Sequence, residues 1–485
     1  MNQTRTTTVI LAWAVAIGVI ADQLLRAEPG INITIAAALL AVAGLAMPKT
    51  QPRAPWPWLA SVFFASMFAF RDTDLLAVDL LAALALASLP LLGERSIRLR
   101  AITLAELVTA PFRPIQAATL DALDFAGQVR TRMAPAVKGQ GQMRGVGIGV
   151  LLSVPLVLVF GSLFASADPV FKSIFGQNLG TAFSHVAVIG VLTVASAGYL
   201  WTLARTPRAY AHTRWIGDLG GPQVQTPLLV TVALFAAFIG VQAYSLFGGQ
   251  QFVETTTGLT YAEYARGGFF QLVFASMLVL PMVYYAPMLA GTLDERASRR
   301  LRLTLLAQLA LTALVLVSAL WRMALYIQMY GLTVDRVNST AIMLWIAATL
   351  AIFAVTVVQG RPERAAYGSL VAAVITLGAL NLANPEVLIA RFNLTHQNGR
   401  EIDFKHLSYL GGGAVPVLVS NFDLVPEAER CHVATRLKER YGTEITDWRS
   451  WNLARKRAHE AVTPLHDLGP CPPVSDPAAG ASAGG

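Results

Sequence analysis

Residues 258–270 read GLTYAEYARGGFF and join two long apolar runs. Thr260 and Glu263 form a Thr-x-x-Glu capping box, which satisfies two free backbone amides where a helix begins. Tyr261 and Tyr264 then share one helical face, and Glu263 lies close to Arg266. Tyrosines at such a helix start are typical of interfacial anchors at a membrane surface. The alternative is that these side chains form one wall of an extracytoplasmic site.

The composition outside this stretch indicates a membrane protein. The chain has 485 residues, of which 55% are hydrophobic and only 14% are charged. Soluble domains carry about a quarter charged residues, so the deficit must come from long uncharged segments. The net charge of +8 is not a nucleic-acid signal, because no arginine-rich tail interleaved with aromatic residues is present in the sequence.

About eleven apolar segments can span or nearly span a bilayer, which needs roughly 17–25 residues per helix. They are predicted at 8–25, 32–47, 58–70, 75–92, 145–165, 182–203, 226–246, 268–290, 303–327, 340–358 and 367–382. The first could be mistaken for a signal peptide, but its length and the spans that follow favour a retained helix. The predicted fold class is therefore all-α, a polytopic transmembrane helical bundle.

Loop charges predict the orientation of this bundle. Twenty Lys and Arg residues fall on one side of the predicted spans and five on the other. Cytoplasmic loops carry the excess of basic residues, so the N-terminus is predicted inside and the C-terminal region outside. The protein is expected in a plasma (inner) membrane as a multi-pass protein.

Composition also divides the chain. We predict a four-span segment at 1–93, a seven-span segment at 145–383 and, between them, a cytoplasmic amphipathic linker at 94–144 that lies on the membrane face. Residues 384–469 are polar and form a small, mostly helical extracytoplasmic domain, with helices at 427–441 and 447–462. The tail at 470–485 is rich in Pro, Ala, Gly and Ser and is predicted to be disordered.

Both cysteines of the chain, Cys431 and Cys471, fall in its C-terminal part. In an oxidising compartment such a pair is typical of a disulfide. A zinc site that adds His432 and His466 is the alternative, but the spacing is not that of a standard finger. We expect no metal and no cofactor.

Polar residues within the spans fall near their outer ends: Asp22, Asp79, His185, Gln242, Gln271, Arg322 and Asn381. An ion-coupled carrier keeps acids or broken helices near the midplane, so this pattern disfavours one. Arg322 lies roughly 7 Å from its helix end at 1.5 Å per residue. It can therefore extend to the surface, or it can pair with Asp22, Asp79 or Glu263.

The candidate site is a polar cluster on the outer face. Its members are Tyr261, Glu263, Tyr264, Arg266, Arg322, Tyr326, Asp335, Arg336 and Arg391. The sequence contains no phosphate loop of the Walker type, no His-Glu-x-x-His and no Gly-x-Ser-x-Gly. No catalytic residue is therefore assigned, and an enzyme is the less favoured class.

Four stretches together resemble a known family: residues 259–270, Arg322–Tyr326 with Tyr330–Thr333, Asn384–Pro385 with Ile389–Asn393, and Ala414–Pro416. They are similar to a bacterial polytopic membrane family catalogued as domain of unknown function 4173, over about residues 145–418. The sequence departs from that pattern at Gly267–Gly268 and Gly411–Gly413. The resemblance implies a bacterial cell-envelope membrane protein but no reaction.

Three hypotheses follow. The first is a non-enzymatic envelope protein that binds a small ligand, a lipid or a partner protein at its extracytoplasmic face. The second is a transporter or channel for a small or amphiphilic solute, which requires a cavity between spans. The third is a membrane-embedded enzyme acting on a lipid-linked substrate, which requires that acids such as Asp79 and Glu263 converge.

Overall fold

The computed structural model describes residues 3–47, 54–92, 102–133, 177–204, 221–257, 269–361, 364–396 and 402–467. Every regular element in these residues is a helix, which confirms the predicted all-α class. The stretch at 258–268 and the predicted span at 145–165 lie outside the described residues.

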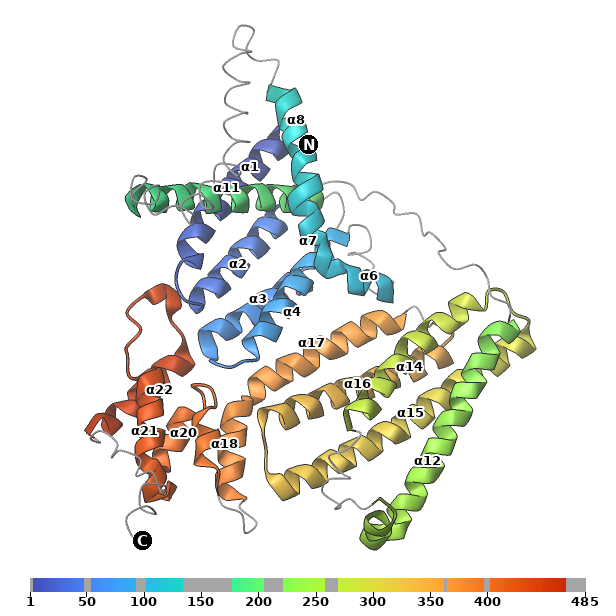
Figure 1. Ribbon diagram of the computed structural model, residues 1–485. Helices are drawn as coiled ribbons and strands as arrows, with labels where there is room; N and C mark the ends of the chain where they lie inside the picture. The colour runs from blue at the N-terminus through green and yellow to red at the C-terminus, as the bar shows by residue number, and fades with distance from the viewer. Residues whose placement is uncertain are drawn as a thin grey trace, which may run out of the picture.

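The apolar helices form two groups (Figure 1). We call the first group the first bundle: α1 (Gln3–Leu25), α2 (Ile31–Ala46), α3 (Trp56–Phe70), α4 (Leu76–Ser88), its extension η1 (Leu89–Leu92) and α11 (Gln177–Ala204). The second bundle comprises α12 (Gly221–Thr257), α14 (Phe269–Leu289), α15 (Glu295–Tyr330), α16 (Val334–Val358) and α17 (Ala365–Ala383).

Seven of the described helices are long and apolar enough to cross a membrane, namely α1, α11, α12, α14, α15, α16 and α17. Helices α2, α3 and α4 with η1 are apolar but shorter. Each of these helices falls on a predicted span, so the protein is a multi-pass membrane protein. The total of about eleven spans and the orientation stay predictions.

Helix boundaries in the second bundle follow local chemistry. The Asp294 side chain accepts a hydrogen bond from the Ala297 amide, 3.2 Å away, and caps the start of α15. Gly331 ends this helix with φ 75°, a left-handed conformation that favours glycine. Thr333 then caps α16 by accepting from the Arg336 amide. The chain therefore turns back sharply between the two helices.

The first bundle depends on close helix approach. Helix α11 belongs by sequence to the predicted seven-span segment, yet it packs along α1. A Cβ at Gly18 of α1 would lie 2.1 Å from the Thr193 hydroxyl oxygen, and one at Gly198 would lie 1.9 Å from the Ala117 carbonyl oxygen. Small residues allow such contacts between membrane helices. The tertiary grouping therefore differs from the order of the spans in the sequence.

The described part of the predicted linker is helical. It contains α6 (Leu104–Thr109), η3 (Ala110–Phe112), α7 (Arg113–Gln116), η4 (Ala117–Asp121) and α8 (Ala122–Met133). A capping box of Thr103 and Glu106 starts α6, and the Leu104 amide donates to the Tyr284 hydroxyl of α14. Large apolar side chains at its exposed surface are Val108, Phe112, Ile115, Leu120 and Leu123. The linker thus contacts the second bundle and keeps an apolar face free.

Residues 384–396 and 402–467 form what we call the C-terminal domain, which has its own hydrophobic core. Its elements are α18 (Pro385–Thr395), α19 (Phe404–Ser408), α20 (Val415–Ser420), η7 (Phe422–Leu424), α21 (Glu427–Tyr441), η8 (Trp448–Ser450), α22 (Leu453–Val462) and η9 (Thr463–Asp467). The helix predicted at 447–462 is interrupted, because Trp451 accepts a hydrogen bond from Ile31 and Asn452 begins a new helix.

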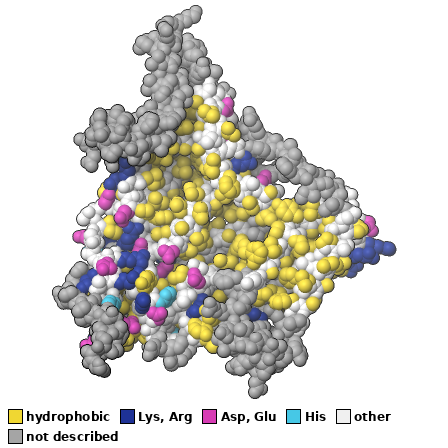
Figure 2. Space-filling view, in the orientation of Figure 1, with side chains coloured by type: hydrophobic (Ala, Val, Ile, Leu, Met, Phe, Trp, Pro, Cys, Tyr) yellow, Lys and Arg dark blue, Asp and Glu magenta, His cyan; other side chains and the backbone are white. Residues whose placement is uncertain are grey.

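On the face of the molecule drawn in Figure 2, charged side chains lie apart from the apolar surface. Hydrophobic side chains cover the two bundles, while charged side chains gather over the C-terminal domain and at the opposite tip. Exposed arginines at the start of α15, Arg296, Arg299, Arg300 and Arg302, belong to the side opposite to the C-terminal domain. An apolar belt between two charged ends is the surface expected of a membrane protein.

Candidate ligand site between the two bundles

The predicted outer-face cluster is only partly described. Tyr261, Glu263, Tyr264 and Arg266 lie outside the described residues. The guanidinium of Arg336 stacks 4.1 Å above the Tyr326 ring and donates to the Tyr330 carbonyl oxygen at 2.9 Å. Arg336 therefore caps the end of α15, which is a structural role.

The other described members of the predicted cluster come from three helices. Arg322 is half-buried on α15, Asp335 is in the first turn of α16, and Arg391 is exposed on α18. Asp22, one of the partners considered for Arg322, pairs with Arg26 at 2.8 Å and with the Nδ1 atom of His185 at 2.5 Å. Cys471 lies outside the described residues, so its disulfide with Cys431 stays a prediction.

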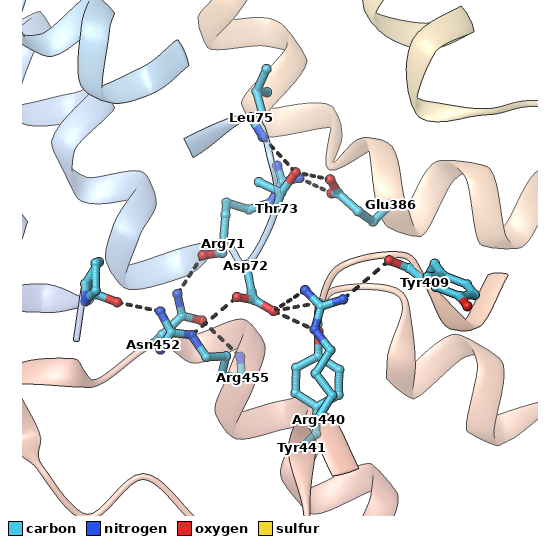
Figure 3. A network of polar contacts seen from close by, with 12 residues as sticks. Arg71, Asp72, Thr73, Leu75, Glu386, Tyr409, Arg440, Tyr441, Asn452 and Arg455 are labelled. Carbon is cyan, nitrogen blue, oxygen red and sulfur yellow. Dashed lines mark hydrogen bonds and ion pairs between the residues drawn. The ribbon is translucent and has the colours of Figure 1, made fainter. Parts of the chain in front are cut away.

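A polar network that the sequence did not reveal is centred on the loop between α3 and α4 (Figure 3). Asp72 accepts hydrogen bonds from the Tyr441 hydroxyl at 2.8 Å and the Gly412 amide at 3.2 Å. The same carboxylate lies 3.4 Å from the guanidinium of Arg455 and 3.7 Å from that of Arg440. One acid of the first bundle thus binds three elements of the C-terminal domain.

Tyr441 is held as a neutral donor in this network. Burial raises the pKa of its hydroxyl well above the usual value, and the negative charge of Asp72 raises it further. The nearby Arg440 and Arg455 act in the opposite direction but do not cancel the effect. The hydroxyl therefore keeps its proton and donates to Asp72.

The adjacent Arg71 links the first bundle to α17 and α18. Its guanidinium donates to the Asn381 carbonyl oxygen and forms an ion pair with Glu386. Thr73 donates its hydroxyl to the same carboxylate. Arg71 and Glu386 are both buried, and a buried ion pair is costly to break because the remaining charge stays without a partner.

Glycine allows the C-terminal domain to reach this loop. A Cβ at Gly411 would lie 1.7 Å from the Asp72 carbonyl oxygen, so no larger residue fits. The run Gly411–Gly413, which differs from the pattern of the resembled family, is therefore the place where two backbones approach closely. The same side of the molecule also holds the α15–α16 turn, where the Leu332 amide donates to the Asn393 side chain at 2.8 Å.

A second buried polar pair joins the two bundles next to this network. The Asn381 side-chain amide on α17 donates to Asp79 Oδ1 on α4 at 2.7 Å. Asp79 is fully buried and Asn381 is 3% exposed. Both residues are among the polar residues that the sequence placed near the outer ends of spans, and the structure brings these two together.

An apolar cavity of about 130 Å³ lies between the bundles. Its walls come from α3, α4 with η1, the linker helices α6 and η3, and α17: Phe64, Ala82, Ala85, Leu86, Leu89, Leu107, Ala110, Pro111, Leu370, Ala373, Val374 and Leu377. No polar side chain lines it. An engineered apolar cavity of about 150 Å³ stays dry and binds benzene, so this space can hold part of a hydrocarbon chain.

The polar pair lies one helical turn beyond the lining of this cavity. Ala82 follows Asp79 by three residues on α4, and Leu377 precedes Asn381 by four residues on α17. Residues three or four apart share a helical face, so each polar residue lies one turn beyond the lining. The lining thus begins one turn from the Asp79–Asn381 pair and extends toward the linker helices, from Ala82 to Leu89 over about 10 Å at 1.5 Å per residue.

The fold and the cavity define the class as an integral, multi-pass, all-helical membrane protein with an apolar site between two helix bundles. The family model described as "Domain of unknown function (DUF4153)" matches residues 58–421, which is more than half of the chain. The chain belongs to this family. The number 4173 inferred from the motifs is therefore wrong, whereas the expectation of a family of unknown function is confirmed.

The matched region begins at Trp58, so it includes the loop at Arg71 and the cavity, whereas the resemblance had begun only at Gly145. Helices α21 and α22, which hold Tyr441 and Asn452, lie beyond it. No curated protein and no solved structure matches the chain.

Proposed function

We propose that this protein is a non-enzymatic membrane protein that binds an amphiphilic molecule, such as a membrane lipid, between its two helix bundles. The observation that supports this proposal is the apolar cavity whose lining begins one helical turn from the Asp79–Asn381 pair. The apolar walls would contact the hydrocarbon chain of the ligand. The Asp79–Asn381 pair would form hydrogen bonds with the polar end of the ligand. Among the occupants considered from the sequence, a lipid fits this arrangement better than a polar solute.

The position of the cavity supports a lipid as occupant. Of the helices that line it, α17 is long and apolar enough to cross a membrane, and α3 and α4 with η1 are shorter apolar helices. We propose that hydrocarbon rather than water surrounds the site. Ala82, Ala373 and Leu377 on its wall are half-buried, and we propose that the ligand enters past them from the membrane. Access from the bilayer therefore needs no channel through the protein.

Filling the cavity tests this proposal. The change Ala373→Trp places an indole into the space, whereas Ile375→Trp puts the same ring on the exposed face of α17. Purified protein in mild detergent is analysed by native mass spectrometry for retained lipid. We expect one lipid fewer in the Ala373→Trp protein and no change in the Ile375→Trp protein.

A second filling variant, Ala82→Leu on the facing helix, makes the test independent of one substitution. Gel filtration shows whether each variant is folded. Wild-type protein without retained lipid, or equal retention in folded Ala373→Trp and Ala82→Leu proteins, would argue against the proposal.

Transport of an amphiphile is the second candidate. The cavity lies where the bundles meet, and a Cβ added at Gly378 of α17 would lie 3.6 Å from the Phe63 ring of α3, so a residue without a side chain stands at this junction. Such a junction permits one bundle to rock against the other. Reconstituted vesicles with a fluorescent lipid test this candidate, because transport would move the label between leaflets and binding alone would not.

We propose the plasma membrane as the location, with the C-terminal domain outside the cytoplasm. The supporting observation is that basic residues at the start of α15 lie opposite to this domain. An introduced Glu439→Cys in a Cys431→Ser, Cys471→Ser background should react with a membrane-impermeant maleimide in intact cells. Arg299→Cys in the same background should react only after lysis, and the reverse result would invert the orientation.

A further inference from the structure

Two buried acceptor atoms, on residues one helical turn beyond the cavity lining, lack a donor among the described residues. These are Oδ2 of Asp79 and Oδ1 of Asn381. Both side chains are more than nine-tenths buried. A buried polar atom without a partner is unfavourable because it has lost its hydrogen bonds to water, so these atoms favour the binding of a hydrogen-bond donor.

The cation nearest to this pair is already used. Arg71 donates to the Asn381 carbonyl oxygen and pairs with Glu386, so its guanidinium is bound on two sides. A carboxylate or phosphate at the end of the cavity would therefore face Asp79 without a free positive charge. Like charges at close distance repel, which disfavours an anionic head in this place.

We infer that the polar end of the bound amphiphile is a hydroxyl or amino group that donates hydrogen bonds to Asp79 and Asn381. This inference rests on the proposed function, because it assumes that the apolar chain occupies the cavity. It deepens that proposal by naming the head: the site takes a long-chain alcohol, an acylglycerol or a long-chain amine and excludes a fatty acid anion.

The position of the pair is consistent with such a molecule. Asp79 lies in the first turn of α4, on the side of the C-terminal domain, whereas Leu89 and Leu107 line the cavity further toward the linker helices. The polar end of the ligand then stays near a membrane surface and its chain extends toward the interior. This is the orientation that a lipid already has in one leaflet.

A comparison of three probes with one chain length tests the inference. Dodecanol, dodecylamine and dodecanoate are titrated against full-length protein in nanodiscs that carries a fluorescent long-chain alcohol, and displacement is measured. We expect the alcohol and the amine to displace the label at concentrations about tenfold lower than dodecanoate, equivalent to ~1.4 kcal/mol. Asn381→Leu and Asp79→Asn should each reduce this preference severalfold.

The matched control is Thr34→Val, which removes a hydroxyl that donates to the Ala65 carbonyl oxygen, away from the cavity lining. It should leave the preference unchanged. Equal displacement by all three probes, or better displacement by dodecanoate, would overturn the inference while the cavity proposal stands. If no probe displaces the label, or if the label binds equally to Ala373→Trp protein, the proposed function itself fails.

Discussion

The side-chain amide of Asn452 donates hydrogen bonds to two carbonyl oxygens at the end of α3, that of Phe68 at 2.8 Å and that of Arg71 at 2.6 Å. Its oxygen accepts from the Arg455 amide at 2.9 Å and so caps α22. One fully buried residue therefore ends a membrane helix and begins a helix of the C-terminal domain. The two parts of the protein are joined by backbone contacts as well as by ion pairs.

Replacing Asn452 by alanine should loosen this junction. The change leaves two buried carbonyl oxygens without their donor and removes a helix cap, which together should lower the free energy of unfolding by about 1–3 kcal/mol. Limited proteolysis of the C-terminal domain in detergent measures the effect. Asn421→Ala, at the end of α20, removes an amide that bonds only within the domain and should leave the cleavage rate nearly unchanged.

Gly411→Ala should prevent the C-terminal domain from packing closely against the α3–α4 loop, because the added Cβ would clash with the Asp72 carbonyl oxygen. Overpacking of this kind lowers the free energy of unfolding by about 1–3 kcal/mol. The group that must move here is a backbone carbonyl rather than the end of a flexible side chain. Thermal unfolding in detergent should show a lower midpoint. Gly127→Ala on α8 is the control, because a Cβ there meets nothing within 4 Å; a similar loss in both proteins would disprove the packing argument.

Arg71 and Glu386 should show strong coupling in a double-mutant cycle. Arg71→Met or Glu386→Leu alone leaves a buried charge without a partner, at a cost of about 3–5 kcal/mol. The double variant removes both charges and should be more stable than either single variant. Denaturant unfolding measures all four proteins, and additive losses would mean that the ion pair contributes little.

The Tyr441 hydroxyl should make docking of the C-terminal domain sensitive to alkaline pH. Because burial raises its pKa in the folded protein, its contribution to stability is complete below the ordinary tyrosine pKa of about 10 and is lost as pH rises above that value. Tyr441→Phe should be less stable at neutral pH, since Asp72 loses a donor, but should lack this alkaline component. Identical pH profiles of the two proteins would show that the hydroxyl ionises freely.

Several features of the fold were predictable from local sequence. The span predicted at 367–382 corresponds to α17 (Ala365–Ala383), because continuous apolar runs admit only a helix in a bilayer. The helix predicted at 427–441 is α21 with the same bounds, since its apolar and charged residues alternate with helical period. The polar residues Asp79 and Asn381 were also identified, because charged and amide groups are rare within spans.

The site was not predictable in the same way. Asp79 and Asn381 are 302 residues apart in the chain, and Asp72 and Tyr441 are 369 apart. Nothing in local composition indicates which of several polar residues will meet. The predicted cluster around Arg322 and Arg336 relied on loops that end on the same side and stays a prediction, while Arg336 caps the end of α15.

By itself the sequence determined that this protein is an all-helical membrane protein, because hydrophobic runs and loop charges act locally along the chain. Only the tertiary structure decided that α11 packs on α1 and that Asp72 binds the Tyr441 hydroxyl of the C-terminal domain. It also decided that an apolar cavity remains near Asp79 and Asn381. The reason is physical: apolar faces of membrane helices are nearly interchangeable, so close packing at small residues and paired buried polar groups select the partners.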